Sequence, residues 1–319
     1  MTTDLFGGFD VPATMFDAVD DIGDNDFMRD RYGRPLILTD AGRIPYTRVS
    51  TVASWAANQE GLAYWKTLTT ALSIAHAPDI AAVIAGMSYD SETNRTLKKF
   101  VDEARARDGW TVAANWGTAV HLFTPSGEGN GQLVYLPAEI KEDVEGYDRE
   151  LERTGLEVVD TEVRVVCDRL KIAGTTDHLY RCPEGSVFRR PIDDALIDLS
   201  GKVIVGDKKT GKPRPLNFAA QLGGYANSFR YNPKTDERSL LHPDLEPRVG
   251  VSAHIPLGEG KSGFGYIDLE AGFMMMAAAC LLHAQRDGRH LIRPVPDRPM
   301  TPDEKFVELE AARDLTKGD

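Results

Sequence analysis

The chain has few cysteines, fewer basic than acidic residues, and no long hydrophobic run. Its three cysteines, Cys167, Cys182 and Cys280, have the spacing of neither a disulfide framework nor a zinc site, which indicates a reducing compartment. The most apolar stretch, residues 271–284, is interrupted by His283 and is too short to span a bilayer. The first residues lack the cationic and apolar regions of a signal peptide. We therefore expect a soluble, cytoplasmic protein that does not contact a membrane.

The charge balance limits the kinds of partner. With 37 basic and 49 acidic residues the formal net charge is −12, which argues against a generally basic, nucleic-acid-coating surface. A local basic groove stays compatible with it, because steering depends on where the charges sit. Eight aspartates lie within the first 30 residues, opposed only by Arg29. We expect residues 1–43 to form an acidic, partly disordered N-terminal segment, with an interaction tail as the alternative.

The spacing of apolar residues changes from helical to strand-like along the chain. Residues 44–110 are predicted to form a helical N-terminal region that opens with a β-rich turn and a helix capped by Ser50 or Thr51. From residue 111 a further helix, a glycine-rich loop and a charged helix at 138–153 precede the strands. The predicted strands are 156–166, 169–180, 202–209, 248–255 and 266–269, and the helices among them are 217–229 and 269–286. The order predicts an α/β fold, a mixed central β-sheet flanked by helices, with a core at 111–295 and a charged tail at 296–319.

The stretch VIVGDKKTGKPRP, residues 203–215, partly matches a nucleotide-binding P-loop. Gly206, Gly211 and Lys212 have the spacing G-x-x-x-x-G-K. A P-loop needs Ser or Thr after this lysine to bind Mg²⁺, whereas Pro213 has neither a hydroxyl nor a backbone N–H. We therefore expect no ATP site.

The same stretch carries Asp207-Lys208-Lys209 at the end of the apolar run 203–205. Residues two apart in a strand share a face, so Asp207 and Lys209 are predicted to project together while Lys208 faces away. A carboxylate binds Mg²⁺, and a nearby ammonium group positions water or stabilises phosphate charge. The pattern favours cleavage of a phosphodiester, although a single Asp–Lys pair is also common as a surface charge pair.

Other strands and helices supply further metal ligands. A hairpin between the second and third predicted strands would place Asp177 beside Asp207, and Glu162 in the preceding strand is a third acidic candidate. His121 would add an imidazole from a helix packed over the sheet edge. These residue types, in this order and on these elements, are more specific than any one of them.

Taken together, the motifs resemble the PD-(D/E)XK nuclease superfamily, in its RecB-like, phage Cas-type exonuclease branch. The matching motifs are G-x-x-x-H at 117–121, G-x-x-D at 174–177, D-x-K-T-G at 207–211 and Q-x-x-x-Y at 221–225. The segment YTRVSTVAS at 46–54 is similar to an N-terminal segment of phage and mitochondrial members. The resemblance implies a restriction-endonuclease-like core in residues 111–295 and a Mg²⁺ or Mn²⁺ cofactor.

The resemblance also implies roles for individual residues. The implied metal ligands are His121, Asp177, Asp207 and the backbone carbonyl of Lys208, with Glu162 as the candidate ligand of a second metal ion. Lys209 is the implied catalytic lysine, acting with Asp177 and Asp207. Gln221 and Tyr225 share a helix face and would position the DNA strand.

Two features depart from the family pattern. The connection from Asp177 to Asp207 is longer than a tight hairpin, and its excess, residues 183–200 with Arg189 and Arg190, is either a DNA-contacting flap or a surface insertion. The iron–sulfur members of the family need four cysteines, so no cluster is expected in this chain.

Basic and aromatic residues supply candidate DNA contacts. Cations near a scissile strand neutralise phosphates, and Lys212 and Arg214 follow the D-x-K motif directly. Trp110, Trp116 and Tyr147 are candidates for stacking on bases, but aromatics at helical spacing more often belong to a core.

We therefore expect a metal-dependent DNA exonuclease, in phage-type recombination, replication or repair, located in the cytoplasm of the host if phage-encoded. The expected partners are single-stranded DNA or duplex ends, with a recombination or single-strand-binding protein as candidate protein partner. Two alternatives stay open: an endonuclease of the same fold, restriction-like or junction-resolving, and a non-catalytic DNA-binding or phage structural protein on the same scaffold.

Overall fold

The computed structural model describes residues 26–56, 60–90, 93–110, 120, 138–286 and 301. One unit extends to His283, and a second begins at Ala284, of which only residues 284–286 and 301 are described. The elements, in chain order, are β1 (Leu36–Thr39), β2 (Gly42–Pro45), β3 (Thr47–Arg48), α1 (Val49–Ala53), the 3₁₀ helix η3 (Ser54–Ala56), α2 (Glu60–Ala75), α3 (Pro78–Ala85), α4 (Asn94–Arg107), α6 (Ala138–Thr154), β4 (Glu157–Cys167), β5 (Ile172–Arg181), β6 (Val187–Arg189), β7 (Leu196–Asp198), β8 (Val203–Lys209), α7 (Pro215–Ala226), β9 (Phe229–Tyr231), β10 (Arg238–Ser239), β11 (Leu245–His254), β12 (Gly263–Asp268) and α8 (Leu269–Ala284).

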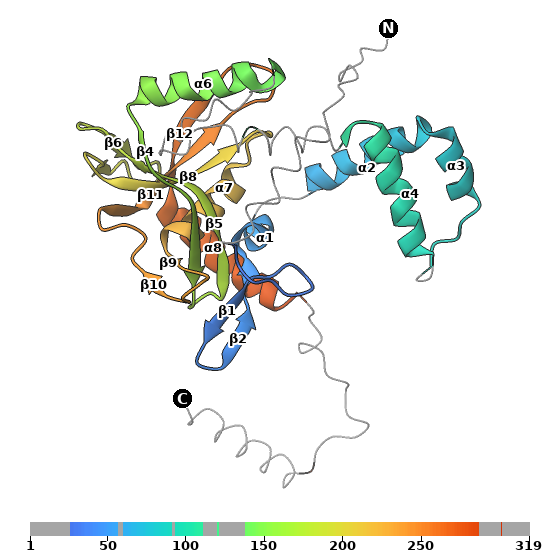
Figure 1. Cartoon of the computed structure of the whole chain (residues 1–319), viewed down its shortest axis with the longest axis horizontal. Coiled ribbons are helices and arrows are strands. Elements are labelled where there is room, and N and C mark those ends of the chain that lie inside the picture. Colours follow the sequence, from blue (N-terminus) through green and yellow to red (C-terminus); the bar gives the residue numbers. More distant parts are fainter. Residues whose placement is uncertain are drawn as a thin grey trace. The chain divides into compact units, whose positions relative to one another are not determined.

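A mixed sheet of eight strands forms the centre of this fold (Figure 1). Its order is β10-β9-β4-β5-β8-β11-β12, and β3 joins it beside β5. The pairs β8–β11 and β3–β5 are parallel, and the other neighbours are antiparallel. Parallel strands need a long crossover connection, and α7 with β9 and β10 supplies it between β8 and β11. The predicted α/β fold with a mixed sheet flanked by helices is confirmed at this level.

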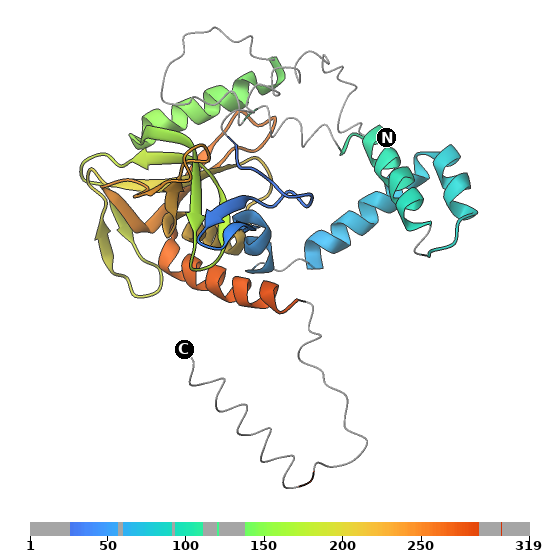
Figure 2. The same ribbon diagram turned by 60° about the horizontal axis from the view of Figure 1, so that its bottom comes forward.

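Helices cover both faces of the sheet. On one face Leu179 and Val205 belong to a core that also contains Leu222 of α7, Met276 of α8 and residues of α1. On the other face Tyr147 of α6 packs with residues of β11 and of the segment that follows it. Figures 1 and 2 place α6 and α8 on opposite sides of the sheet.

Helices α7 and α8 approach each other backbone to backbone. A Cβ atom on Gly272 would lie 2.1 Å from the carbonyl oxygen of Ala219, and one on Gly223 would lie 2.5 Å from the amide nitrogen of Phe273. Both distances are too short for any side chain, so glycine is required at this crossing. The contact fixes the position of α7 over the sheet.

The N-terminal part differs from the prediction in two ways. Helix α1 begins at Val49 after Arg48, and no side chain caps it, so the predicted cap at Ser50 or Thr51 is wrong. The reason is that β3 pairs with β5 up to Arg48 and the chain enters the helix directly from this strand. Consequently β3 and α1, although within 44–110, join the sheet and its core.

The remaining helices of this region, α2, α3 and α4, pack against one another around Ala77, Ile80 and Ala104. Within the described residues, no single helix is long and apolar enough to cross a bilayer; α2 and α3 would meet that criterion only as a pair bent by 105°. Of the predicted helix at 111–123, all but Val120 lies outside the described residues. The β1–β2, β6–β7 and β9–β10 pairs were not predicted.

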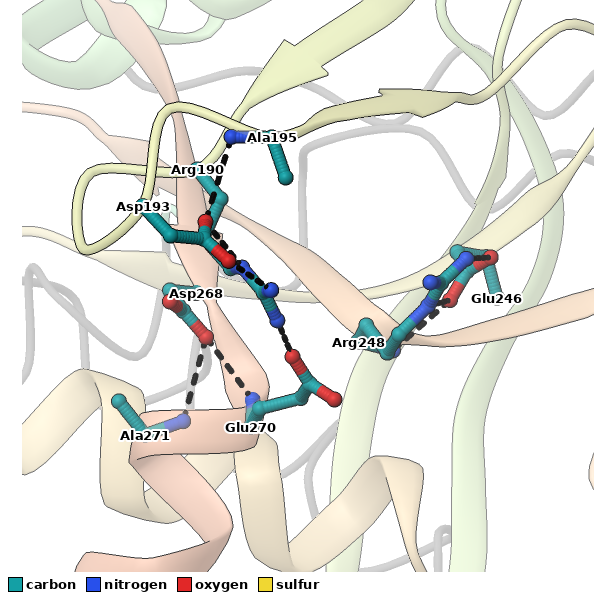
Figure 3. A network of polar contacts seen from close by, with 8 residues as sticks. All are labelled: Arg190, Asp193, Ala195, Glu246, Arg248, Asp268, Glu270 and Ala271. Atoms are coloured by element: carbon teal, nitrogen blue, oxygen red, sulfur yellow. Dashed lines mark hydrogen bonds and ion pairs between the residues drawn. The ribbon is translucent and has the colours of Figure 1, made fainter.

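The chain between β5 and β8 forms the β6–β7 hairpin. Phe188 and Ile197 are buried against the sheet, and Arg190 at its tip forms ion pairs with Asp193 and with Glu270 of α8 (Figure 3). The hairpin joins the end of β5 to the start of β8, whereas Asp207 lies near the other end of β8. This position favours the surface insertion over the DNA-contacting flap.

Candidate active site

The central pair of the candidate site is Asp207 and Lys209 on β8. Their side chains form an ion pair between Lys209 Nζ and Asp207 Oδ2. Lys209 Nζ also lies 5.6 Å from the ring centroid of Phe218 in α7, so the pair faces this helix. The predicted projection to a common face is confirmed. Asp207 is 4% exposed, which excludes an ordinary surface charge pair.

Asp177 of β5 lies next to this pair. Strands β5 and β8 are antiparallel with His178 opposite Gly206, so Asp177 and Asp207 follow at neighbouring positions. Asp177 Oδ2 accepts a hydrogen bond of 2.6 Å from the backbone N–H of Lys208. The predicted proximity of the two strands is therefore confirmed. Burial raises the pKa of Asp177, and the charges of Lys209 and Lys208 oppose this rise.

Glu162 lies in β4, which is antiparallel to β5. Its neighbours Thr161 and Val163 pair with His178 and Thr176, so Glu162 lies opposite Asp177. Its φ of 49° is in the left-handed region, which is uncommon for a residue with a side chain and is enriched at functional sites. The side chain is exposed, yet the protein around it desolvates the carboxylate and raises its pKa, and the charge of Asp207 acts in the same direction. Glu162 is thus close enough to sense the charge of the central pair.

The side chain of Lys208 is 1% exposed. Its Cα is opposite Ala253, which belongs to the core on the α6 side of the sheet. This agrees with the predicted orientation away from Asp207. Burial lowers the pKa of Lys208, while Asp177, Glu162 and Asp207 raise it.

Gln221 and Tyr225 of α7 complete the site on the helix side. Gln221 Nε2 donates to Asp207 Oδ1 at 3.1 Å and to the Tyr225 hydroxyl at 3.0 Å. Both residues are buried, with Gln221 7% and Tyr225 3% exposed. The predicted sharing of a helix face is confirmed: the Gln221 amide contacts both the carboxylate of Asp207 and the hydroxyl of Tyr225.

The segment that leaves β8, residues 210–214, carries Lys212 and Arg214; we call it the basic loop. Both residues are exposed, and neither forms an ion pair within the described part of the chain.

The residues present fit a hard divalent cation by the chemistry of their donors. Asp177 and Asp207 offer carboxylate oxygens from neighbouring strands, which is the ligand type that Mg²⁺ prefers. Among the described residues no three His, Cys, Asp or Glu side chains form a complete metal-binding group. His121, the fourth predicted ligand, lies outside the described residues, as does Trp116.

Two of the aromatic candidates, Tyr147 and Trp110, lie within the described residues, and both contact other aromatic residues of the protein. Tyr147 is fully buried and its hydroxyl lies 2.7 Å from that of Tyr180, so the prediction that it belongs to a core is confirmed. Trp110 is half-buried and stacks on Trp65 with ring centroids 5.2 Å apart.

One residue near the site was not singled out in the sequence. His254, the last residue of β11, is directly opposite Lys209 in the parallel register. The alternating pattern RVGVSAHI placed it on a strand, but only the strand order brings it to Lys209.

The site thus combines an Asp–Lys pair whose carboxylate is buried, a second carboxylate on the adjacent strand, a Gln–Tyr pair on the covering helix and an exposed basic loop. Comparison of the sequence with protein-family models finds no match, and comparison with curated proteins finds no significant relative.

Proposed function

We propose that this protein is a Mg²⁺- or Mn²⁺-dependent DNA exonuclease with a PD-(D/E)XK nuclease core. The observation that carries the proposal is the pair Asp207 and Lys209 on a central strand: Asp207 is buried, and Asp177 and Gln221 contact the same short segment. A charge pair placed only for solubility would be exposed and would need no such partners.

The order of elements also supports the proposal. The series α1, β4, β5, β8, α7, β11 has three antiparallel strands, a crossover helix and a parallel strand. The restriction-endonuclease-like core implied by the resemblance has this arrangement. The exonuclease branch is favoured over the endonuclease by the Q-x-x-x-Y motif at 221–225.

In the proposed mechanism the residues that would hold the metal ion are His121, Asp177, Asp207 and Lys208 through its backbone carbonyl, and Glu162 would serve a second ion. A bound Mg²⁺ would neutralise charge on the scissile phosphate and lower the pKa of a water molecule. Lys209, which reaches the surface beside Asp207, orients the attacking water and stabilises negative charge on the phosphate in the transition state.

The other residues of the chain orient and bind. Gln221 donates to one oxygen of Asp207, and the other oxygen forms the ion pair with Lys209. Lys212 and Arg214 bind phosphates of the strand that enters the site, without reading its bases. The proposed biological role is DNA processing in phage-type recombination, replication or repair, in the cytoplasm, with a recombination or single-strand-binding protein as partner.

Digestion of end-labelled DNA tests this proposal. The purified protein is incubated with Mg²⁺ and linear single- or double-stranded DNA labelled at the 5′ or 3′ end, and with closed circular DNA. We expect degradation of linear DNA, sparing of circles, and loss of activity in Asp207→Ala. Cutting of circles would support the endonuclease instead, and DNA binding without any cleavage would support the non-catalytic alternative.

A further inference from the structure

The basic loop is stiff except at its beginning. Pro213 and Pro215 fix their own φ angles, and each restricts the residue before it to an extended conformation. Arg214 has φ −130° and ψ 79°, which is outside the helical region, and Pro215 is the first residue of α7. Lys212 and Arg214 therefore move together, as one short segment attached to the helix.

Gly211 is the point at which this segment could move relative to β8. It has no side chain, and a Cβ atom built on it would meet nothing within 4 Å. A side chain at this position would thus meet no packed neighbour. Glycine also has more backbone freedom than other residues, so a hydrogen bond to Gly211 restricts the direction in which the basic loop leaves the sheet.

His254 supplies a hydrogen bond at this position. The backbone N–H of Ile255 donates to Lys209 O at 2.8 Å, which continues the pairing of β11 with β8. Beyond it, the His254 ring Nε2 lies 3.0 Å from the carbonyl oxygen of Gly211 and, since a carbonyl only accepts, donates to it. The side chain thus extends the contact between the strands by two residues, from Lys209 to Gly211.

We infer that His254 is a positioning residue that holds the basic loop, and with it Lys212 and Arg214, against the end of β8 so that their cations face the incoming phosphates. The inference rests on the proposed function for its substrate, DNA, and on the contacts of His254 for its geometry. His254 acts through the basic loop, because its ring donates to the carbonyl oxygen of Gly211.

The inference separates binding from chemistry. Asp207 and Lys209 are held by the sheet and by Gln221, whatever the basic loop does. Loss of the His254 contact therefore weakens the hold on the DNA strand and leaves the reacting groups in place. We expect KM to rise while kcat changes little.

Three variants test the inference: His254→Leu removes the donor, His254→Gln keeps an N–H donor at a similar reach, and His242→Leu is the control. His242 precedes β11, at the end of the strand far from His254. Hydrogen exchange of the peptide containing residues 210–214 is measured for each variant, together with steady-state degradation of a linear oligonucleotide.

We expect faster exchange of the basic loop and a KM raised about five-fold in His254→Leu, which corresponds to the loss of one hydrogen bond. His254→Gln should restore both values, and kcat should stay within about two-fold throughout. Unchanged exchange in His254→Leu, failure of glutamine to rescue, or a fall in kcat at constant KM would each overturn the inference. If the wild-type protein does not degrade DNA, the proposed function fails, while the exchange data still decide whether His254 holds the basic loop.

Discussion

Replacement of Gln221 by leucine tests how much the polar contacts of the site contribute to the stability of the protein. The amide donates to two buried acceptors, one of them the carboxylate of Asp207 and the other the hydroxyl of Tyr225. Leucine has a similar volume but no donor, so it removes both hydrogen bonds at once and leaves the acceptors without the amide. The substitution therefore separates the polar contacts of α7 from its packing.

The magnitude follows from the two contacts. A hydrogen bond to a charged group contributes about 1.5–3 kcal/mol and one to a neutral group about 0.5–1.5 kcal/mol. The leucine side chain recovers about 1 kcal/mol by burying more apolar surface. We therefore expect the free energy of unfolding to fall by about 1–3.5 kcal/mol, and kcat/KM to fall at least about ten-fold because Asp207 is no longer oriented.

Urea denaturation measures this change, provided that the slope with urea is the same for both proteins. The matched control is Gln285→Leu, the same substitution at an exposed position just after α8. It should change the free energy of unfolding by less than about 0.5 kcal/mol. A loss of this small size in Gln221→Leu as well would refute the reasoning.

Three further predictions concern the fold, its pH dependence and DNA binding. Gly272→Ala should lower the melting temperature strongly, since its Cβ would lie 2.1 Å from a backbone oxygen. The control Gly61→Ala, also in a helix, should leave the melting temperature unchanged, because its Cβ would meet nothing within 4 Å. Equal melting temperatures of the two variants would contradict the close contact at Gly272. Burial and the hydrogen bond to Asp168 raise the pKa of Tyr46 to about 12. The stability that this tyrosine contributes is therefore complete below pH ~10 and is lost as the pH rises toward 12. Unfolding curves of Tyr46→Phe should show a smaller loss of stability over this pH range. Alanine at both cations of the basic loop should reduce the slope of log K for DNA binding against log salt by about 1–2, and an unchanged slope would exclude them from the phosphate contacts.

Local patterns were sufficient to predict the centre of the site. The apolar run before Asp207 predicted a buried strand, and the two-residue period of a strand placed Asp207 and Lys209 on one face. The four-residue spacing on a helix did the same for Gln221 and Tyr225. Each of these relations lies within one element, and this is why it can be read from the sequence.

Relations between elements were harder to predict. The pairs β1–β2, β6–β7 and β9–β10 are only two to four residues per strand, too short for a period to be visible. The contact of His254 depends on the order of β8 and β11 in the sheet, and the burial of Lys208 depends on the core on the α6 side. Helix α1 has no side-chain cap because the chain enters it directly from β3, which pairs with β5. No local feature of the sequence predicts this pairing.

The most direct test of the central claim is the rate of Mg²⁺-dependent degradation of a linear DNA by the wild-type protein, Asp207→Asn and Lys209→Gln at equal folded concentration. Asparagine keeps the shape of aspartate without its charge, and glutamine is a shorter, uncharged polar side chain at the partly exposed position 209, so circular dichroism should show an unchanged fold. The account predicts degradation by the wild-type protein and a loss of at least about a hundred-fold in each variant. Undiminished degradation by both variants would contradict it.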